Sequence, residues 1–413
     1  MNIFALLTLL SPFAGAQPVA SVSTNTVIST GTAAAPSLRL LSESEVPRFE
    51  DSFKSKAGLV KAAKKALKYL EGQPPTRYFH LADRQYATGA LIDTVKELLE
   101  LLAKNPSPDD LDQEIKARFD VFQSVGSDGA GKVVFSSYYQ PVLNASLKKS
   151  AKYPYPIYRQ PPDMAQAELS DFDRKFAGET LIGRLDKNKR FVPYFNRDQI
   201  DVHKALAGKG LEIAWLTDKW DVLDLHIQGS GILKLPGGKE VLAGYAATNA
   251  RPYNSAALLL VKAGVFTRDE ITPDKIRGYF REHPEAQDWV ISQNPRFTFF
   301  RLAPMTEDGE PFGTTNQSLT PARAIAIDPA VIPLGALAFF STTSPQADAD
   351  GRLLGLFPNS RLALCMDTGG AIKGPGRVDI YAGHGKQAST TAHNQWHEGS
   401  LYILIKKIPS RER

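Results

Sequence analysis

The segment formed by residues 362–381 constrains the fold most, because it joins two apolar runs through a glycine-rich connection. The runs 362–366 and 378–381 are short and rich in residues that favour β-strands, which predicts two buried strands. Asp367 and Asp379 stand at the two ends of the connection. Two carboxylates at strand ends are typical of a site for acid–base chemistry. The alternative is a structural connection in which both aspartates accept hydrogen bonds from backbone N–H groups.

The composition favours a β-rich, loop-rich protein of two or three domains. The chain has 413 residues, with 31 glycines, 28 prolines and 43% hydrophobic residues, and many short apolar runs lie between the glycines and prolines. This texture argues against a helical bundle. The net charge of +5 suits an anionic partner. Because no basic stripe is interleaved with aromatic residues, a nucleic-acid partner is not expected.

The N-terminal segment has the pattern of an export signal. Residues 1–16 are mostly apolar and end in small residues before Gln17, and the apolar run is too short to cross a membrane. No later segment reads as a transmembrane helix. Residues 17–40 are rich in Ser, Thr and Ala, which predicts a flexible leader. No cysteine lies near residue 17 to carry a lipid. The one cysteine, Cys365, falls in an apolar strand and is expected to be a core residue.

Apolar spacing predicts helices around 59–70 and 88–103, the first with lysines along its polar side. Those lysines are interpreted as a solvated face, with a docking patch for an anionic polymer as the alternative. From residue 132 the pattern changes to short strands, one of them expected at 222–227 because apolar residues alternate there. Residues 341–360 are interpreted as a polar surface loop.

Several further motifs occur in one order along the chain. They lie at 137–143 (Ser-Tyr-Tyr-Gln-Pro-Val-Leu), 153–159, 192–194, 227–231, 244–249, 252–255, 293–295 with 299–300, and 328–335. Together with 367–381, this ordered set resembles the membrane-bound lytic murein transglycosylase A family over roughly residues 130–405. Each motif is weak alone, whereas the ordered set is specific.

The resemblance implies a mainly β fold, with a double-psi β-barrel as the main domain and a second β-barrel domain inserted into it. A large groove between the two domains would hold a glycan. The expected boundaries are 1–16 for the signal peptide, 17–40 for the leader, 41–142 plus 301–409 for the catalytic barrel, and 143–300 for the inserted substrate-binding domain.

The resemblance also implies an enzyme that cleaves peptidoglycan glycan strands without water. It breaks the β-1,4 bond between N-acetylmuramic acid and N-acetylglucosamine and leaves a 1,6-anhydromuramoyl end. The catalytic aspartate of the family corresponds to Asp379, with Asp367 as its companion and Asp328 less directly involved. For Asp328, which precedes Pro329, a turn is the favoured role. No cofactor or metal is implied, and the expected location is the periplasm or the outer membrane, as a monomer with other cell-wall proteins as further partners.

One carboxyl group is chemically sufficient for this reaction. A hydrolase needs a second carboxylate to activate water or to attack carbon. In the lytic reaction the tethered C6 hydroxyl of the muramic acid replaces water and benefits from a large effective molarity. Asp379 must then be protonated near neutral pH, and burial and a charged Asp367 would raise its pKa. Lys373 and Arg377 would lower that pKa if they pointed at it, and they are expected to face substrate carboxylates or the rim.

A set of aromatic and amide residues supplies candidates for sugar contacts. Tyrosines can stack on sugar faces and donate hydroxyl hydrogen bonds, and amides can pair with N-acetyl groups. The alternative for each tyrosine is a half-buried core residue. The predicted substrate-binding residues, besides Asp328 and Lys373, are Tyr138, Tyr139, Gln228, Gly229, Tyr245, Asn249, Tyr253 and Tyr381.

The chain departs from the family pattern at two positions. Gln140 stands where the family usually has glutamate, and Ala250 stands where it usually has glycine. Both lie in segments expected to line the groove, so the details of sugar contact are open at these points.

Other functions remain as alternatives. A non-catalytic peptidoglycan-binding protein and a glycan hydrolase using the same aspartates both fit the motif. An aspartic protease would need two Asp-Thr-Gly loops, and the chain has one, beginning at Asp367. A metal hydrolase would draw on His393 and His397, but Glu398 lies outside the histidine pair, unlike in zincins.

Overall fold

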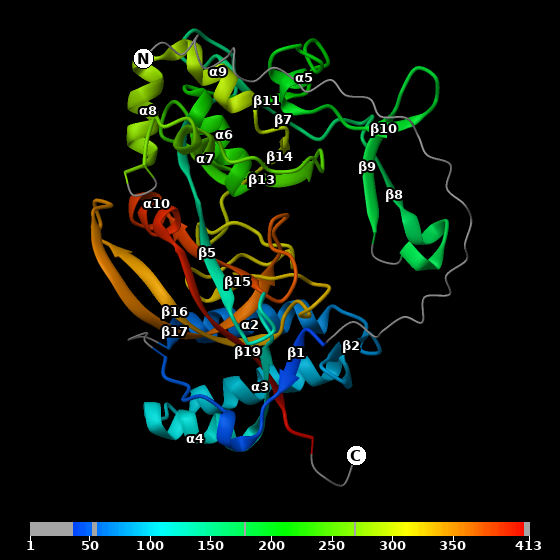
Figure 1. Cartoon of the computed structure of the whole chain (residues 1–413), viewed down its shortest axis with the longest axis vertical. Helices are drawn as coiled ribbons and strands as arrows, with labels where there is room; N and C mark the ends of the chain where they lie inside the picture. The colour runs from blue at the N-terminus through cyan, green and yellow to red at the C-terminus, as the bar shows by residue number, and fades with distance from the viewer. Residues whose placement is uncertain (1–35, 52–55, 177–178, 268–269, 409–413) are drawn as a thin grey trace. The chain divides into compact units, whose positions relative to one another are not determined.

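The computed structural model describes residues 36–51, 56–176, 179–267 and 270–408, and its β-strands fall mainly into two large sheets (Figure 1). The predicted signal peptide and the predicted leader up to residue 35 lie outside the described residues. Within the described ranges, no helix combines the length and the hydropathy needed to cross a bilayer.

The first sheet closes into a six-stranded barrel built from segments far apart in the chain. Its strands follow in the order β5 (Val133–Gln140), β18 (Arg377–His384), β15 (Ala324–Ala326), β17 (Leu353–Asp367), β16 (Leu337–Ala347) and β19 (Trp396–Lys406). Pairing of β19 with β5 closes the barrel. Figure 1 shows β5, in teal, against the orange and red C-terminal strands. The prediction of a mainly β fold with a β-barrel is confirmed.

Two parallel pairings decide what meets at one end of this barrel. β18 runs parallel to β5, and β15 runs parallel to β17, whereas β15 and β18 are antiparallel. Ala326 of β15 consequently has Asp367 as its partner on one side and Asp379 on the other. Neighbouring strands lie about 4.8 Å apart, so the backbones of the two aspartates are about 10 Å apart.

Two strands and three helices near the N-terminus extend and cover the barrel. β4 (Phe119–Ser124) continues the sheet beyond β19, and β1 (Leu38–Leu40) pairs with β4. The helices are α2 (Ala57–Glu71), α3 (Thr88–Ala103) and α4 (Pro108–Arg118), with the hairpin β2 (Tyr78–Leu81) and β3 (Arg84–Ala87) between the first two, and the short helix η1 is Glu43–Glu45. Both predicted helices are confirmed, and α2 buries its apolar stripe in the barrel core.

The lysines of α2 do more than contact solvent. Lys61 and Lys65 both pair with Asp308, at 3.0 and 2.7 Å. These ion pairs tie α2 to the segment that precedes β15, so the interpretation as a purely solvated face is wrong for these two side chains.

The second sheet belongs to the segment between β5 and β15. Its strand order is β14 (Thr298–Ala303), β13 (Glu240–Thr248), β12 (Gly231–Lys234), β6 (Val142–Ser146), β11 (Glu212–Leu216) and β7 (Tyr155–Tyr158). The associated helices are α5 (Arg197–Asp201), α6 (Lys219–Gln228), α7 (Ala256–Lys262), α8 (Pro273–Glu282) and α9 (Pro284–Ser292), visible around this sheet in Figure 1. A smaller sheet contains β8 (Ala165–Glu168), β9 (Thr180–Leu185) and β10 (Phe191–Pro193), with short helices η2 (Leu169–Asp171) and η3 (Arg174–Phe176).

The predicted strand at 222–227 is wrong, because these residues form most of helix α6. The side chain of Asp218 accepts a hydrogen bond from the Trp220 N–H and starts the helix, and Gly229 ends it with φ of +80°. Val222, Leu223 and His226 are all buried, so the helix has no single apolar stripe. An almost entirely buried helix shows no helical periodicity in its sequence.

The predicted surface loop at 341–360 is also wrong, because β16 and β17 continue through it as a long hairpin. Their register runs from Ser341 opposite Ser360 to Ala347 opposite Leu353. Polar side chains stabilise this part of the hairpin, as the 2.7 Å hydrogen bond from Asn359 to Ser344 shows. The polar residues of these two paired strands therefore predict a loop from the sequence, although the strands form a ladder.

The expected leader ends earlier than residue 40. Leu38–Leu40 form β1, with Leu38 opposite Ser124 and its side chain 2% exposed. Pairing with β4 supplies backbone hydrogen bonds that the local sequence does not indicate.

Helix α10 (Gly385–Asn394) connects β18 to β19. It carries His393, whose Nδ1 lies 2.7 Å from the Ser389 carbonyl, and His397 lies beyond it on β19. In the described part of the chain, no group of three or more His, Cys, Asp and Glu side chains is placed to hold a metal ion.

Candidate active site

Asp379 lies on β18 beside Ser136 of the parallel strand β5. Its Oδ1 accepts a 2.8 Å hydrogen bond from the Ser136 hydroxyl. The Ser136 Oγ in turn accepts a 3.0 Å hydrogen bond from Nη2 of Arg377. Arg377 and Asp379 are two residues apart on one strand, so both side chains lie on the same face of the sheet. The guanidinium also lies over the Trp396 ring, 4.3 Å from its centroid.

Burial raises the pKa of Asp379 to about 6, and the nearby Asp367 contributes in the same direction. The hydrogen bond from Ser136 and the charge of Arg377 oppose this shift. Removal of a carboxylate from water disfavours its charged form, and here this effect is larger than the two opposing ones. Asp379 is therefore a carboxyl group able to exchange a proton near neutral pH.

Asp367, at the end of β17, is held by four hydrogen bonds. Its Oδ2 accepts from the Tyr138 hydroxyl at 2.7 Å. Its Oδ1 accepts from the N–H and the hydroxyl of Thr314, at 2.9 and 2.8 Å, and from the N–H of Thr368 at 2.9 Å. Four donors suit a charged carboxylate in a fixed position. The two aspartates both stand at an end of the glycine-rich connection, but Asp367 accepts four hydrogen bonds and Asp379 accepts one among the described residues.

The tyrosines of β5 and β18 divide into different environments. The rings of Tyr138 and Tyr381 lie 5.2 Å apart, and Tyr381 is fully buried with its hydroxyl donating to Glu310. Tyr139 is 6% exposed and donates to Asp224. Because the rings of Tyr381 and Tyr139 are buried, neither presents a face to a ligand in this structure. Both match the alternative interpretation as core residues.

Asp328 holds the glycine-rich connection between the two catalytic candidates. Its Oδ2 accepts from the N–H of Gly374 at 2.7 Å, and its Oδ1 accepts from the N–H of Ala330 at 3.2 Å. Gly374 has φ of +72°, a conformation that favours glycine. These contacts agree with the favoured turn role, and Asp328 is only 8% exposed. Lys373, the residue before Gly374, is exposed.

The amide candidates of the inserted segment make structural contacts. Asn249 is buried, and its Nδ2 donates to the carbonyls of Phe195 and Pro295, both at 2.9 Å. Both hydrogens of the Asn249 amide nitrogen are therefore used within the protein. Gln228 accepts from the N–H of Tyr139 at 3.1 Å and so joins α6 to β5.

Two tyrosines of the inserted segment keep open faces. Tyr245 on β13 is 47% exposed, and Tyr253, which follows β13, is 42% exposed. Gly229 lies near Tyr245, since a Cβ placed on this glycine would be 3.9 Å from the tyrosine ring. These two rings are the candidates that remain available to stack on a sugar.

The two departures from the family pattern differ in their surroundings. Gln140 is fully buried, and neither amide atom has a hydrogen-bond partner among the described residues. Ala250 has φ of +53°, in the left-handed region where glycine is the ordinary residue. Neither side chain contacts Asp367 or Asp379 through a hydrogen bond in the described ranges.

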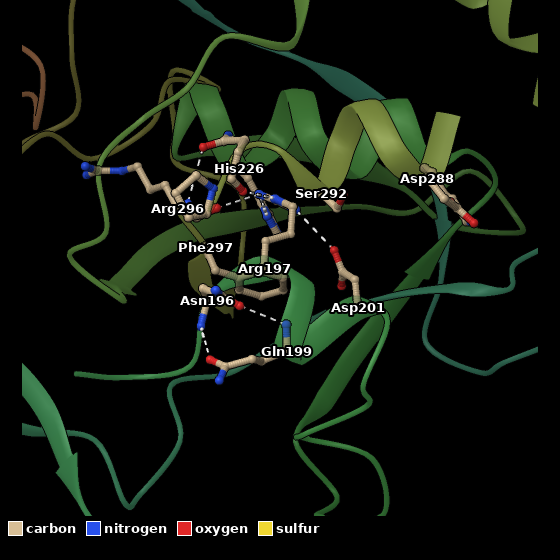
Figure 2. Close-up of polar contacts among 12 residues, drawn as sticks. Asn196, Arg197, Gln199, Asp201, His226, Asp288, Ser292, Arg296 and Phe297 are labelled. Atoms are coloured by element: carbon tan, nitrogen blue, oxygen red, sulfur yellow. Dashed lines mark hydrogen bonds and ion pairs between the residues drawn. The ribbon is translucent and has the colours of Figure 1, made fainter. Parts of the chain in front are cut away.

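A buried cation organises the inserted segment and was not recognised in the sequence. Figure 2 shows Arg197 of α5 at the centre of this cluster. Arg197 is 1% exposed and donates to the Asn294 carbonyl at 3.0 Å, the Arg296 carbonyl at 2.8 Å and His226 Nδ1 at 2.9 Å. Asp201 lies 3.4 Å away. Burial, and then the charge of Arg197, hold the pKa of His226 well below its ordinary value, so this imidazole is neutral.

Sequence reasoning also missed the side chains that hold the two aspartates. Ser136 precedes Tyr138 by two residues, so alternation along β5 would have placed both on one face. Thr314 and Glu310 lie in an irregular segment with no periodic signal. Cys365 is buried, as expected.

Comparison with known proteins identifies both large parts of the chain. The MltA specific insert domain matches residues 134–301, and the 3D domain matches residues 323–405. A membrane-bound lytic murein transglycosylase A homolog of Buchnera aphidicola is 27% identical over 315 residues, covering 76% of each chain. Membrane-bound lytic murein transglycosylase A of Escherichia coli is 28% identical over 290 residues, covering 69% of each chain.

Among solved structures, the membrane-bound lytic murein transglycosylase from Agrobacterium tumefaciens is 27% identical to this chain. It superposes with a TM-score of 0.69 over 91% of this chain and 99% of its own. The two domain matches together exceed half of the chain and agree with the relatives and with the fold. The chain belongs to the membrane-bound lytic murein transglycosylase A family.

Proposed function

We propose that this protein is a lytic transglycosylase of peptidoglycan. It cleaves the β-1,4 bond between N-acetylmuramic acid and N-acetylglucosamine and forms a 1,6-anhydromuramoyl end. Its relatives carry the name of this activity. The observation that carries the proposal is the state of Asp379, a carboxyl group on the barrel with a pKa raised to about 6 by burial.

Asp379 acts first as an acid and then as a base. Its proton passes to the glycosidic oxygen as the bond to C1 of the muramic acid breaks. The resulting carboxylate then accepts the proton of the C6 hydroxyl while O6 bonds to C1. The group ends protonated as it began, so one carboxyl group completes the cycle. No water enters, because the attacking hydroxyl is already tethered to the reacting sugar.

Asp367 supports this chemistry as a fixed negative charge. Its four hydrogen bonds keep it in place, and its charge contributes to the raised pKa of Asp379. In this proposal the charge of Asp367 also stabilises the oxocarbenium character that the sugar ring develops in the transition state.

The glycan lies in a groove between two domains, the barrel of residues 41–142 with 301–409 and the inserted residues 143–300. The exposed rings of Tyr245 and Tyr253 stack on sugars, and Lys373 faces substrate from the glycine-rich connection. Residues 1–16 direct the chain to the cell envelope, where it acts in the periplasm or at the outer membrane as a monomer beside other cell-wall proteins.

Mass spectrometry of the products released from purified sacculi tests the proposal. We expect wild-type protein to release muropeptides one water lighter than hydrolysis products, and Asp379→Ala to release none. Products that contain the added water would identify a hydrolase. Binding to sacculi without any soluble product would identify a non-catalytic glycan-binding protein.

A further inference from the structure

Arg296 occupies a rigid turn between α9 and β14. The buried guanidinium of Arg197 holds the carbonyls of Asn294 and Arg296, at 3.0 and 2.8 Å. The N–H of Arg296 donates to the side chain of Asn294 at 3.3 Å. Figure 2 shows the Arg296 side chain extending away from the Arg197 cluster. The backbone of Arg296 is therefore fixed while its guanidinium is presented outward.

The Arg296 guanidinium lies against the glycine-rich connection of the barrel. A Cβ on Gly370 would overlap Nη2 of Arg296 and lie 2.7 Å from its Nη1. Gly370 follows the catalytic candidate Asp367 by three residues and is exposed. The absence of a side chain at Gly370 is what lets the guanidinium lie over this backbone.

The same guanidinium is close to a tyrosine available for sugar stacking. Burial raises the pKa of the Tyr245 hydroxyl, and the charge of Arg296 opposes this shift. The Arg296 guanidinium thus acts electrostatically on Tyr245 and lies against the loop that follows Asp367. Both neighbours belong to the surface on which the glycan is proposed to lie.

Arg296 has no carboxylate partner within the described ranges. No hydrogen bond or ion pair from its guanidinium is found there, although the acid closest in sequence on the loop, Asp367, accepts four hydrogen bonds from other groups. A planar guanidinium offers two parallel N–H groups, the geometry that matches a carboxylate. A half-buried arginine whose backbone is held in place, and whose guanidinium has no partner among the described residues, is suited to bind an anion from outside the chain.

We propose that Arg296 binds a carboxylate of the peptidoglycan strand and so selects muramic acid-containing glycan over neutral glycan. This inference rests on the proposed function. Two sources offer the same chemistry: the lactyl carboxylate of muramic acid once the peptide has been removed, and the carboxylates of the stem peptide. In both cases the carboxylate places the muramic acid next to Asp367 and Asp379.

The test measures binding and cleavage separately with three probes. These are peptide-bearing glycan strands, strands stripped of peptide by an amidase, and the neutral hexamer of N-acetylglucosamine. Dissociation constants are measured in an Asp379→Asn background, which prevents cleavage, and KM and kcat are measured with active protein. We expect Arg296→Gln to raise Kd and KM for carboxylate-bearing strands about tenfold to a hundredfold. The kcat should change less than about twofold, because the carboxylate is bound equally in the ground and transition states.

Three further variants make the test specific. Arg296→Lys keeps the charge but not the planar fork, so its effect should be intermediate. Gly370→Ala keeps Arg296 but displaces its guanidinium, and should weaken binding of the same probes severalfold. Arg281→Gln, which removes an exposed arginine of α8, should change none of these values.

The outcome with each probe distinguishes the two sources of the carboxylate. It also separates failure of this inference from failure of the proposed function. Weakened binding of stripped strands identifies the lactyl carboxylate, and weakened binding of peptide-bearing strands alone identifies the stem peptide. Unchanged binding of every probe by Arg296→Gln, or an equal loss with the neutral hexamer, overturns the inference. Because Kd is measured without cleavage, a wild type that binds strands but releases no anhydro product overturns the proposed function and not this assignment.

Discussion

Arg197 in the inserted segment is buried and Asp379 on the barrel is half-buried, and their surroundings pair these two charges to different extents. Arg197 donates hydrogen bonds to two carbonyls and an imidazole, with Asp201 beside it. The Asp379 carboxyl accepts one hydrogen bond, from Ser136, among the described residues. The first charge is almost fully paired, whereas the second is not.

The difference separates a structural charge from a reactive one. A buried ion is costly unless hydrogen bonds and opposite charges replace its hydration. For Arg197, hydrogen bonds and the charge of Asp201 replace the lost water, and the same hydrogen bonds hold the turn that presents Arg296. For Asp379 the lost hydration of the carboxylate is only partly replaced, and its pKa is therefore raised to about 6. Incomplete stabilisation of its charge is what makes the proton of Asp379 available at neutral pH.

The largest effect is expected for Asp379→Asn. Removal of the acid should reduce release of anhydromuropeptides by about a thousandfold or more. The wild type should lose stability as pH rises from about 4 to about 6, since the unfolded chain ionises this group first. The variant lacks that loss, so its free energy of unfolding at pH 7 should be higher by about 2–3 kcal/mol. Denaturant unfolding at pH 4 and pH 7 measures this difference in the free energy of unfolding. Equal stability of both proteins at pH 7 would contradict the claim that the charge of Asp379 is incompletely stabilised.

Arg197→Met should have the next largest effect, and chiefly on stability. Its removal leaves two buried carbonyls and Asp201 without their partner, which costs about 3–5 kcal/mol. Arg197 is not among the causes of the shifted pKa of Asp379, so the pH dependence of the remaining activity should keep its midpoint. Thermal unfolding and a pH–rate profile measure the two quantities. A shifted midpoint would show that the two centres are coupled.

The pH–rate profile of the wild type should follow the protonation of Asp379. The acid must be neutral to donate, so kcat/KM should be constant well below pH 6 and fall about tenfold per pH unit above it. Initial rates on soluble glycan strands between pH 4 and pH 9 measure this dependence. A rate that rises from pH 6 to pH 9 would exclude Asp379 as the proton donor.

Smaller effects are expected from the neighbours of Asp379, in opposite directions. Ser136→Ala removes a hydrogen bond that lowers the pKa, and should move the midpoint of the profile to higher pH. Asp367→Asn removes a charge that raises the pKa, and should move the midpoint to lower pH. The rate change at the pH optimum from Ser136→Ala should be less than about tenfold. A shift in the same direction for both variants would refute this account.

Much of the molecule could be predicted from the sequence, because local signals extend over a few residues. The stripes of α2 and α3, the glycine-rich connection after Asp367 and the buried strand around Cys365 all carry such signals. The ordered motifs also indicated the family. Where burial is complete, as in α6, or where polar side chains form a ladder, as in the hairpin of β16 and β17, the local signal was misleading.

Sequence alone determined that two aspartates flank a glycine-rich connection in a β-rich chain. Tertiary structure decided the hydrogen-bond partners of these aspartates and the pKa of Asp379. Ser136 and Asp379 are 243 residues apart and meet only because β5 and β18 pair in parallel. Burial by that pairing sets the pKa of Asp379, and the contact of Arg296 with Gly370 joins two distant segments. Such properties depend on strand register and on desolvation by the whole fold, which no short stretch of sequence encodes.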